Sequence, residues 1–138
     1  MDNFDLRKYL AENKLNKENE ESSDKLTDDE VSSNPYQFSD YLERKYDNLE
    51  EIGIWKNDLD GTMTIEILKT YEPGEGTGSE VMKEVIKWAD SNKFTLTLTP
   101  DTSFGMGMSE LKSFYKKFGF KDNTNRKFKG GTMYRLPK

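Results

Sequence analysis

A glycine-rich run, Pro73-Gly74-Glu75-Gly76-Thr77-Gly78-Ser79, stands directly before an amphipathic segment of the sequence. Glycines let a backbone approach a ligand without Cβ atoms in the way. The first turn of a helix exposes N–H groups that lack intrahelical acceptors, together with a partial positive charge. A helix that begins at this run therefore predicts an anion site, with phosphate or pyrophosphate as the ligand.

Glycine spacing alone leaves this prediction open. The dinucleotide pattern G-x-G-x-x-G needs a third glycine that is missing in every register, and the P-loop sequence Gly-Lys-Ser/Thr is also missing. A tight turn without a ligand is the alternative interpretation of the run taken by itself.

Two polar side chains stand out within the predicted elements. Tyr115 lies on the apolar stripe of a predicted helix, a position that by itself favours a packing residue. Glu66 lies within a predicted strand, where it is either a general base for an amine or an ordinary solvent-facing residue. The chain has no histidine and no cysteine. This composition excludes Ser-His-Asp hydrolysis, a thiol nucleophile and disulfides, and no metal site is expected.

The hydrophobic pattern predicts the elements that would position these groups. Helices are expected near 37–48, 79–91 and 109–118, and strands at 51–56, 62–70, 93–99 and 132–136. The order of strand, glycine loop, helix and strand is that of a β-α-β unit.

Finer features follow from the same pattern. Asp60-Gly61 predicts a hairpin between the first two strands. Gly119 is expected at the C′ position of the last helix, with Phe120 folding back in a Schellman contact. Alternation along strand 62–70 places two sets of side chains on opposite faces: Met63, Ile65 and Ile67 on one, and Thr64, Glu66 and Leu68 on the other.

Charge divides the chain. Residues 1–35 hold 10 acidic and 5 basic side chains, and only 33% of the whole sequence is apolar. We expect residues 1–35 to be an acidic, largely disordered arm with a short helix near 4–15, followed by one domain over 36–138. The sequence has neither an apolar run long enough for a membrane span nor a signal-peptide core, so a cytoplasmic location without membrane contact is expected.

The last quarter is basic, with nine Lys or Arg and one acid between Lys112 and Lys138. Such a segment can attract a polyanion, although it is more often a solvated face. Its aromatic residues fit the helix stripe better than a stacking surface. The sequence therefore does not favour a nucleic acid partner.

Two segments resemble the acetyl-CoA-binding core of the GNAT acetyltransferase superfamily. The glycine run is similar to that family's Q/R-x-x-G-x-G/A motif, with Gly76 and Gly78 as its glycines. The run from Phe114 to Phe120 resembles the motif of the family's last helix. More narrowly, the stretch from Gly76 to Pro137 is similar to small GNAT-like proteins encoded by tailed, marine phages.

The resemblance implies an α+β (α/β-type) fold, with a mixed, mostly antiparallel sheet and two core helices behind a flexible arm. It implies acetyl-CoA-dependent N-acetyl transfer to an unknown amine acceptor, with acetyl-CoA as co-substrate. Tyr115 would protonate the departing thiolate, with Glu66 as the candidate base. Backbone groups of Leu68 and Thr70 would pair with pantetheine. The groups near the CoA phosphates would be the amides of Gly76, Thr77, Gly78 and Ser79 and the side chain of Lys117.

Two departures from the family motif favour an alternative. Pro73 stands where the motif has Gln or Arg, and Glu75 stands where related loops often carry a basic residue. A non-catalytic GNAT-fold phage structural or accessory protein, carried in the virion, would tolerate both. Its arm would then dock a phage or host protein through Leu6, Tyr9 and Leu10.

Overall fold

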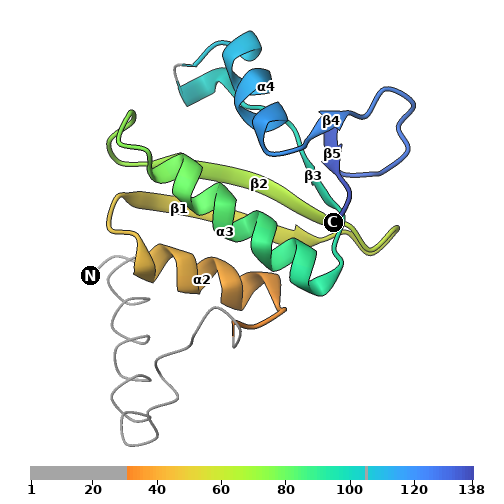
Figure 1. The fold of residues 1–138 in the computed structure, drawn as a ribbon, viewed down its shortest axis with the longest axis horizontal. Coiled ribbons are helices and arrows are strands. Elements are labelled where there is room, and N and C mark those ends of the chain that lie inside the picture. The colour runs from red at the N-terminus through yellow and green to blue at the C-terminus, as the bar shows by residue number, and fades with distance from the viewer. Residues whose placement is uncertain (1–30, 105) are drawn as a thin grey trace, which may run out of the picture. The chain divides into compact units, whose positions relative to one another are not determined.

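The computed structural model describes residues 31–104 and 106–138, so the helix expected near 4–15 lies outside the described residues. One compact unit spans Ser32–Lys138. Figure 1 shows its elements, which in chain order are α2 (Pro35–Lys45), β1 (Leu49–Lys56), β2 (Met63–Thr70), α3 (Thr77–Asn92), β3 (Leu96–Leu98), the short 3-10 helix η3 (Thr102–Phe104), α4 (Met108–Lys117), β4 (Lys121–Asp122) and β5 (Met133–Arg135).

The five strands form one sheet in the order β1-β2-β3-β5-β4. Among the strands that the structure describes, only β2 and β3 pair in parallel, and α3 connects them as the predicted β-α-β unit. The β1–β2, β3–β5 and β4–β5 pairs are antiparallel. The prediction of an α+β fold with a mixed, mostly antiparallel sheet is therefore confirmed.

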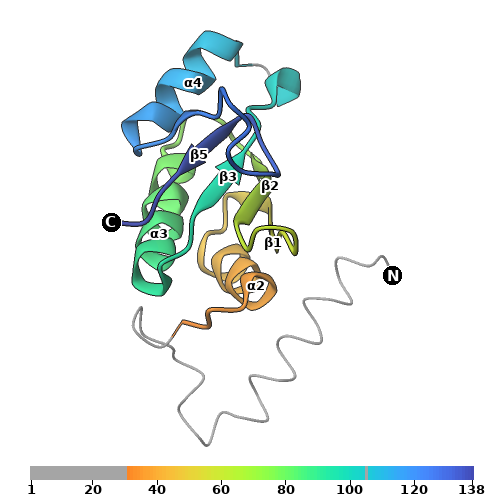
Figure 2. The ribbon, with the colours of Figure 1, turned by 90° about the vertical axis from the view of Figure 1, so that its right-hand side faces the viewer.

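One row of side chains forms the centre of the core. Directly paired residues share a face of a sheet, and pairing aligns Ile54, Ile65, Leu98 and Met133, which are all buried. Two helices pack side by side against this core, because the ring of Phe38 on α2 stacks on Trp88 of α3 at 4.5 Å. Figure 2 shows α3 to one side of the strands.

A β-bulge at Glu66 makes the predicted faces of β2 wrong in its second half. Gly53 pairs with Ile67 and Ile54 with Ile65, so Glu66 has no counterpart on β1. An extra residue reverses the alternation beyond it. Leu68 consequently lies opposite Ile52 on the core face, and Ile67 lies on the other face.

Helix boundaries follow from local capping. Asn34 accepts hydrogen bonds from the N–H groups of Tyr36 and Gln37 through Oδ1, at 2.9 and 3.1 Å. With Pro35 in the first turn, this cap starts α2 earlier than the hydrophobic pattern predicts. The helix α3 ends at Asn92, one residue later than the pattern predicts, because Lys93 adopts a left-handed conformation with φ 60° and caps it there. The expected strand 93–99 therefore shortens to β3.

The helix α4 ends as predicted but is less buried than expected. Gly119 has φ +95°, and its N–H bonds the carbonyl of Lys116 at 3.0 Å. The N–H of Phe120 bonds the carbonyl of Tyr115 at 3.3 Å, which completes the Schellman motif. The apolar stripe of α4 is only half-buried, and α2 and α3 supply the fully buried helical side chains.

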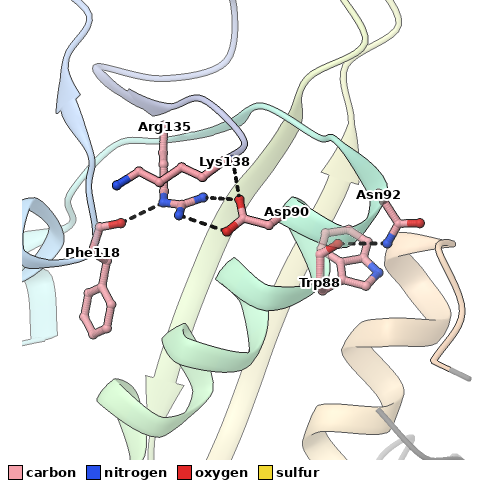
Figure 3. A network of polar contacts seen from close by, with 6 residues as sticks. All are labelled: Trp88, Asp90, Asn92, Phe118, Arg135 and Lys138. Carbon is pink, nitrogen blue, oxygen red and sulfur yellow. Dashed lines mark hydrogen bonds and ion pairs between the residues drawn. The ribbon is translucent and has the colours of Figure 1, made fainter. Parts of the chain in front are cut away.

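Arg135 ties α4 to the rest of the unit (Figure 3). Its side chain is only 4% exposed and forms two bonds to the carboxylate of Asp90, at 2.8 and 3.2 Å. Its Nε donates to the carbonyl of Phe118 at 2.7 Å, at the C-terminal end of α4. The hydrogen bonds from Arg135 to Asp90 are the main reason that the pKa of Asp90 lies below its ordinary value.

Within the part of the chain that the structure describes, no helix combines the length and apolar character needed to traverse a lipid bilayer.

Candidate functional site

The strands β2 and β3 separate before β2 reaches the glycine loop. They pair only between Met63–Ile65 and Leu96–Leu98, whereas β2 continues to Thr70. The chain leaves the sheet after Leu98 through Thr99-Pro100 and enters η3 and α4. The second half of β2 therefore pairs with a strand on one side only, among the strands described here.

The backbone of β2 presents two residues to this open edge. The N–H of Tyr71 donates to the carbonyl of Asn48 at 2.9 Å, just beyond the pair Leu49–Thr70. That bond marks a non-hydrogen-bonded pair, so the N–H and C=O of Thr70 point away from β1. Alternation gives Leu68 the same direction.

The bulge at Glu66 is the cause of this orientation. The N–H of Met63 donates to the carbonyl of Thr95, which places the odd-numbered residues at the start of β2 toward β3. Without an extra residue, the odd-numbered positions would keep that edge to the end of β2. Because of the bulge, the backbone groups of Leu68 and Thr70 face that edge instead, and these are the two residues predicted to pair with pantetheine.

The glycine loop follows this edge and is fixed from outside. Gly74 and Gly76 have φ of +84° and +81°, a region that favours glycine. The side chain of Asn48 donates to the carbonyl of Glu72 and to Oγ1 of Thr77, each at 2.9 Å. It also accepts a hydrogen bond from the N–H of Glu72 at 2.8 Å. Sequence reasoning missed Asn48, because a lone Asn before a strand carries no distinctive pattern.

The start of α3 exposes the backbone amides that the sequence predicts. The first intrahelical bond runs from the N–H of Glu80 to the carbonyl of Gly76 at 3.1 Å, and no side chain caps the helix. The N–H groups of Thr77, Gly78 and Ser79 have no acceptor among the described residues. A Cβ at Gly74 or Gly76 would meet nothing within 4 Å, so the outer side of the loop is open.

The glycine run and the segment 114–120 meet at Gly78. A Cβ on Gly78 would lie 3.9 Å from Cζ of Phe114, which places α4 against the first turn of α3. Lys117 lies nearly one turn further along α4 and is exposed. Helical spacing keeps residues three apart on neighbouring positions of one face.

Tyr115 is half-buried in an aromatic cluster. Its ring lies 5.1 Å from that of Phe114 and 5.9 Å from that of Phe120. Burial first, and then the charge of Asp101, raises the pKa of Tyr115 above its ordinary value. The hydroxyl is therefore protonated at neutral pH, and it makes no hydrogen bond to the residues described. A protonated hydroxyl without a partner can donate to a ligand.

Glu66 is exposed and lies at the point where β2 and β3 separate. The structure thus gathers the open edge of β2, the glycine loop and α4 around one end of the parallel strand pair. The predicted residues Leu68, Thr70 and 76–79 follow one another along that path, and α4, which approaches Gly78 through Phe114, carries Tyr115 and Lys117.

Searches with this chain against protein-family models, curated proteins and solved structures find no match.

Proposed function

We propose that the chain binds acetyl-CoA and transfers the acetyl group to an amine. One observation carries the proposal: the open edge of β2 leads directly into a glycine loop, and the first N–H groups of the helix that follows have no acceptor within 31–104 and 106–138. The pantetheine arm and the pyrophosphate of CoA follow one another in the same order. An amide-bearing arm adds to a sheet edge as a strand does, and a helix N-terminus favours a pyrophosphate.

Charges around the loop act in both directions. Glu75 is exposed between two glycines and repels a bound pyrophosphate by about 1 kcal/mol at short range in screened surroundings. Lys117, three residues after Phe114 on α4, is the candidate for an opposing positive charge. The net effect of these two charges on the affinity for acetyl-CoA can be measured.

The proposed reaction is direct attack of a neutral amine on the thioester carbonyl. A C–N bond forms, the C–S bond breaks, and Tyr115 gives its proton to the departing thiolate. The proton lost by the amine passes to Glu66, directly or through water. Glu66 then releases that proton to solvent, and solvent returns one to Tyr115. Catalysis would come mainly from positioning, without a covalent enzyme intermediate.

Calorimetric titration with acetyl-CoA tests the binding step. The Gly78→Trp variant would force an indole between α3 and Phe114 and fill the space at the amides. Ser91→Trp adds the same side chain at an exposed position near the other end of α3 and serves as the matched control. We expect the wild-type chain and Ser91→Trp to bind and Gly78→Trp to fail. No binding by wild type at millimolar acetyl-CoA would contradict the proposal.

A second candidate is the non-catalytic GNAT-fold phage structural or accessory protein. The exposed carboxylate of Glu75 favours it, since a scaffold has no need to accommodate an anion there. A Glu75→Gln variant distinguishes the two. If that variant binds acetyl-CoA and the wild-type chain does not, the loop retains the shape of a cofactor site without its function.

A further inference from the structure

The face of the sheet opposite the core carries one row of residues through all five strands. Direct pairing aligns Trp55, Thr64, Thr97, Tyr134 and Lys121. The loop 123–132, between β4 and β5, lies over the middle of this row. A Cβ on Gly130 would lie 2.4 Å from Oγ1 of Thr64 and 2.9 Å from Oγ1 of Thr97.

Hydrogen bonds fix the conformation of this loop. The side-chain amide of Asn123 donates to the carbonyls of Phe128 and Gly131, at 2.8 and 2.9 Å. The carboxylate of Asp60 accepts a bond from the N–H of Lys129 at 2.7 Å. Arg126 has φ +50°, a left-handed conformation that L-residues other than glycine rarely adopt. These hydrogen bonds therefore fix the loop while Arg126 keeps a strained backbone conformation.

Four cations project from this loop and from the adjoining strand β4. Lys121, Arg126, Lys127 and Lys129 are exposed and form no ion pair with the residues described. By contrast, Lys112 and Lys116 on α4 lie 3.4 and 3.9 Å from the carboxylate of Asp122. The nearby carboxylate of Asp60 accepts hydrogen bonds from Thr62 and from the N–H of Lys129, and its single negative charge offsets only one of the four cations. The loop surface thus has an excess of positive charge.

Two aromatic rings lie among these cations. The ring of Phe128 is 5.1 Å from that of Tyr134, at an angle of 47°, and both residues are half-buried. The Nζ of Lys127 lies 5.5 Å above the ring of Phe128. Unlike the aromatic stripe of α4, this pair belongs to a sheet face and its covering loop. Cations interleaved with aromatic rings allow phosphates to be neutralised while bases stack.

We propose that this loop surface binds single-stranded nucleic acid. Arg126, Lys127 and Lys129 contact phosphates, and a base stacks on Phe128 after the side chain of Lys127 swings aside. Stacking selects a single strand over a duplex, because the bases of a duplex are already stacked on one another. An acidic peptide would engage the cations and leave the rings unused. The site shares no residue with the proposed acetyl-CoA site.

Fluorescence anisotropy with the full chain and a labelled oligo(dT) of about 12 nucleotides tests this proposal. Lys127→Glu is compared with Lys83→Glu on α3, which changes the net charge equally. Arg126→Gly removes the guanidinium and suits the positive φ, so it leaves the fold intact. Phe128→Leu keeps apolar bulk and removes the ring.

We expect the wild-type chain and Lys83→Glu to bind with similar affinity. Lys127→Glu, Arg126→Gly and Phe128→Leu should each weaken binding by about fivefold or more. The slope of log affinity against log salt should fall by about 0.7 in Arg126→Gly. Three results would each overturn the proposal: no binding at low salt, equal effects of Lys127→Glu and Lys83→Glu, or equal affinity for duplex DNA or polyglutamate.

Discussion

The side-chain amide of Asn48 donates a 2.9 Å hydrogen bond to Oγ1 of Thr77, and it also holds the carbonyl of Glu72 at the same distance. Both ends of the glycine loop are therefore attached to one side chain in the turn between α2 and β1. Glycines have no side chains that could fix the conformation of the loop. The shape of the loop consequently depends on a residue that lies outside it.

Asn48→Ala should destabilise the unit by about 1–3 kcal/mol, because it leaves the N–H and carbonyl of Glu72 without their partner. It should also weaken acetyl-CoA binding if the proposed site is correct, since the loop amides lose their fixed geometry. Urea denaturation gives the first effect and calorimetry the second. Asn125→Ala, at an exposed position in the β4–β5 loop, is the control and should change neither. A stability equal to wild type in Asn48→Ala would show that the loop is fixed otherwise.

The pair of Asp90 and Arg135 predicts that the free energy of unfolding decreases at acid pH. The depressed pKa of Asp90 means that its ionised form is stabilised in the folded state. That contribution is complete above the ordinary value of 3.8 and is lost as the pH falls through the lower folded value. Asp90→Asn should cost about 3 kcal/mol at neutral pH, because Arg135 is then buried without its counter-ion.

Chemical denaturation of wild type and Asp90→Asn across pH measures this effect. The difference in unfolding free energy should be constant above about pH 5 and shrink below 3.8. Asp47→Asn, at an exposed position between α2 and β1, controls for the loss of one charge. A difference that does not change with pH would mean that hydrogen bonding alone, rather than charge, stabilises the pair.

Local signals in the sequence predicted much of the fold. The apolar stripe that stops at Gly119 predicted both the end of α4 and its Schellman motif. The glycine run predicted the start of α3 and its exposed amides to within two residues. Each of these features is set by residues close together in the chain. Hydrophobic period and capping chemistry capture such features well.

Features that depend on pairing between distant segments were not predictable. The bulge at Glu66 depends on how β1 and β2 pair, and no residue type in β2 marks that position. The clamp by Asn48 joins residues 29 apart in the chain. The strand β4 has two residues, too few for any alternation to be detected. The bulge nevertheless decides which backbone groups of β2 face the candidate site.

Gly131→Ala should be far more destabilising than Gly61→Ala. A Cβ on Gly131 would lie 2.4 Å from the carbonyl oxygen of Leu98, so the β4–β5 loop would have to leave the sheet. A Cβ on Gly61 meets nothing within 4 Å and costs only the strain of φ +76°, about 1 kcal/mol. Thermal unfolding of both variants checks this prediction. Similar melting temperatures would mean that the loop can move away without loss.

The environment of Tyr46 predicts that the free energy of unfolding decreases at alkaline pH. Its hydroxyl donates to the carboxylate of Glu84, and burial first, followed by this hydrogen bond, raises the pKa of Tyr46 to about 12. The protonated phenol is the form that the folded state favours. Its contribution to stability is therefore complete below the ordinary value of 10.0 and is lost as the pH rises toward about 12.

Ultraviolet titration of the folded protein should show one tyrosine that ionises near pH 12, and Tyr46→Phe should remove that phase. Denaturation between pH 8 and 11 should show the stability difference between wild type and Tyr46→Phe falling only above about pH 10. Tyr36→Phe, at an exposed position on α2, is the control and should leave the late phase in place. A late phase that persists in Tyr46→Phe would assign the high pKa to another tyrosine, with the half-buried Tyr115 as the next to test.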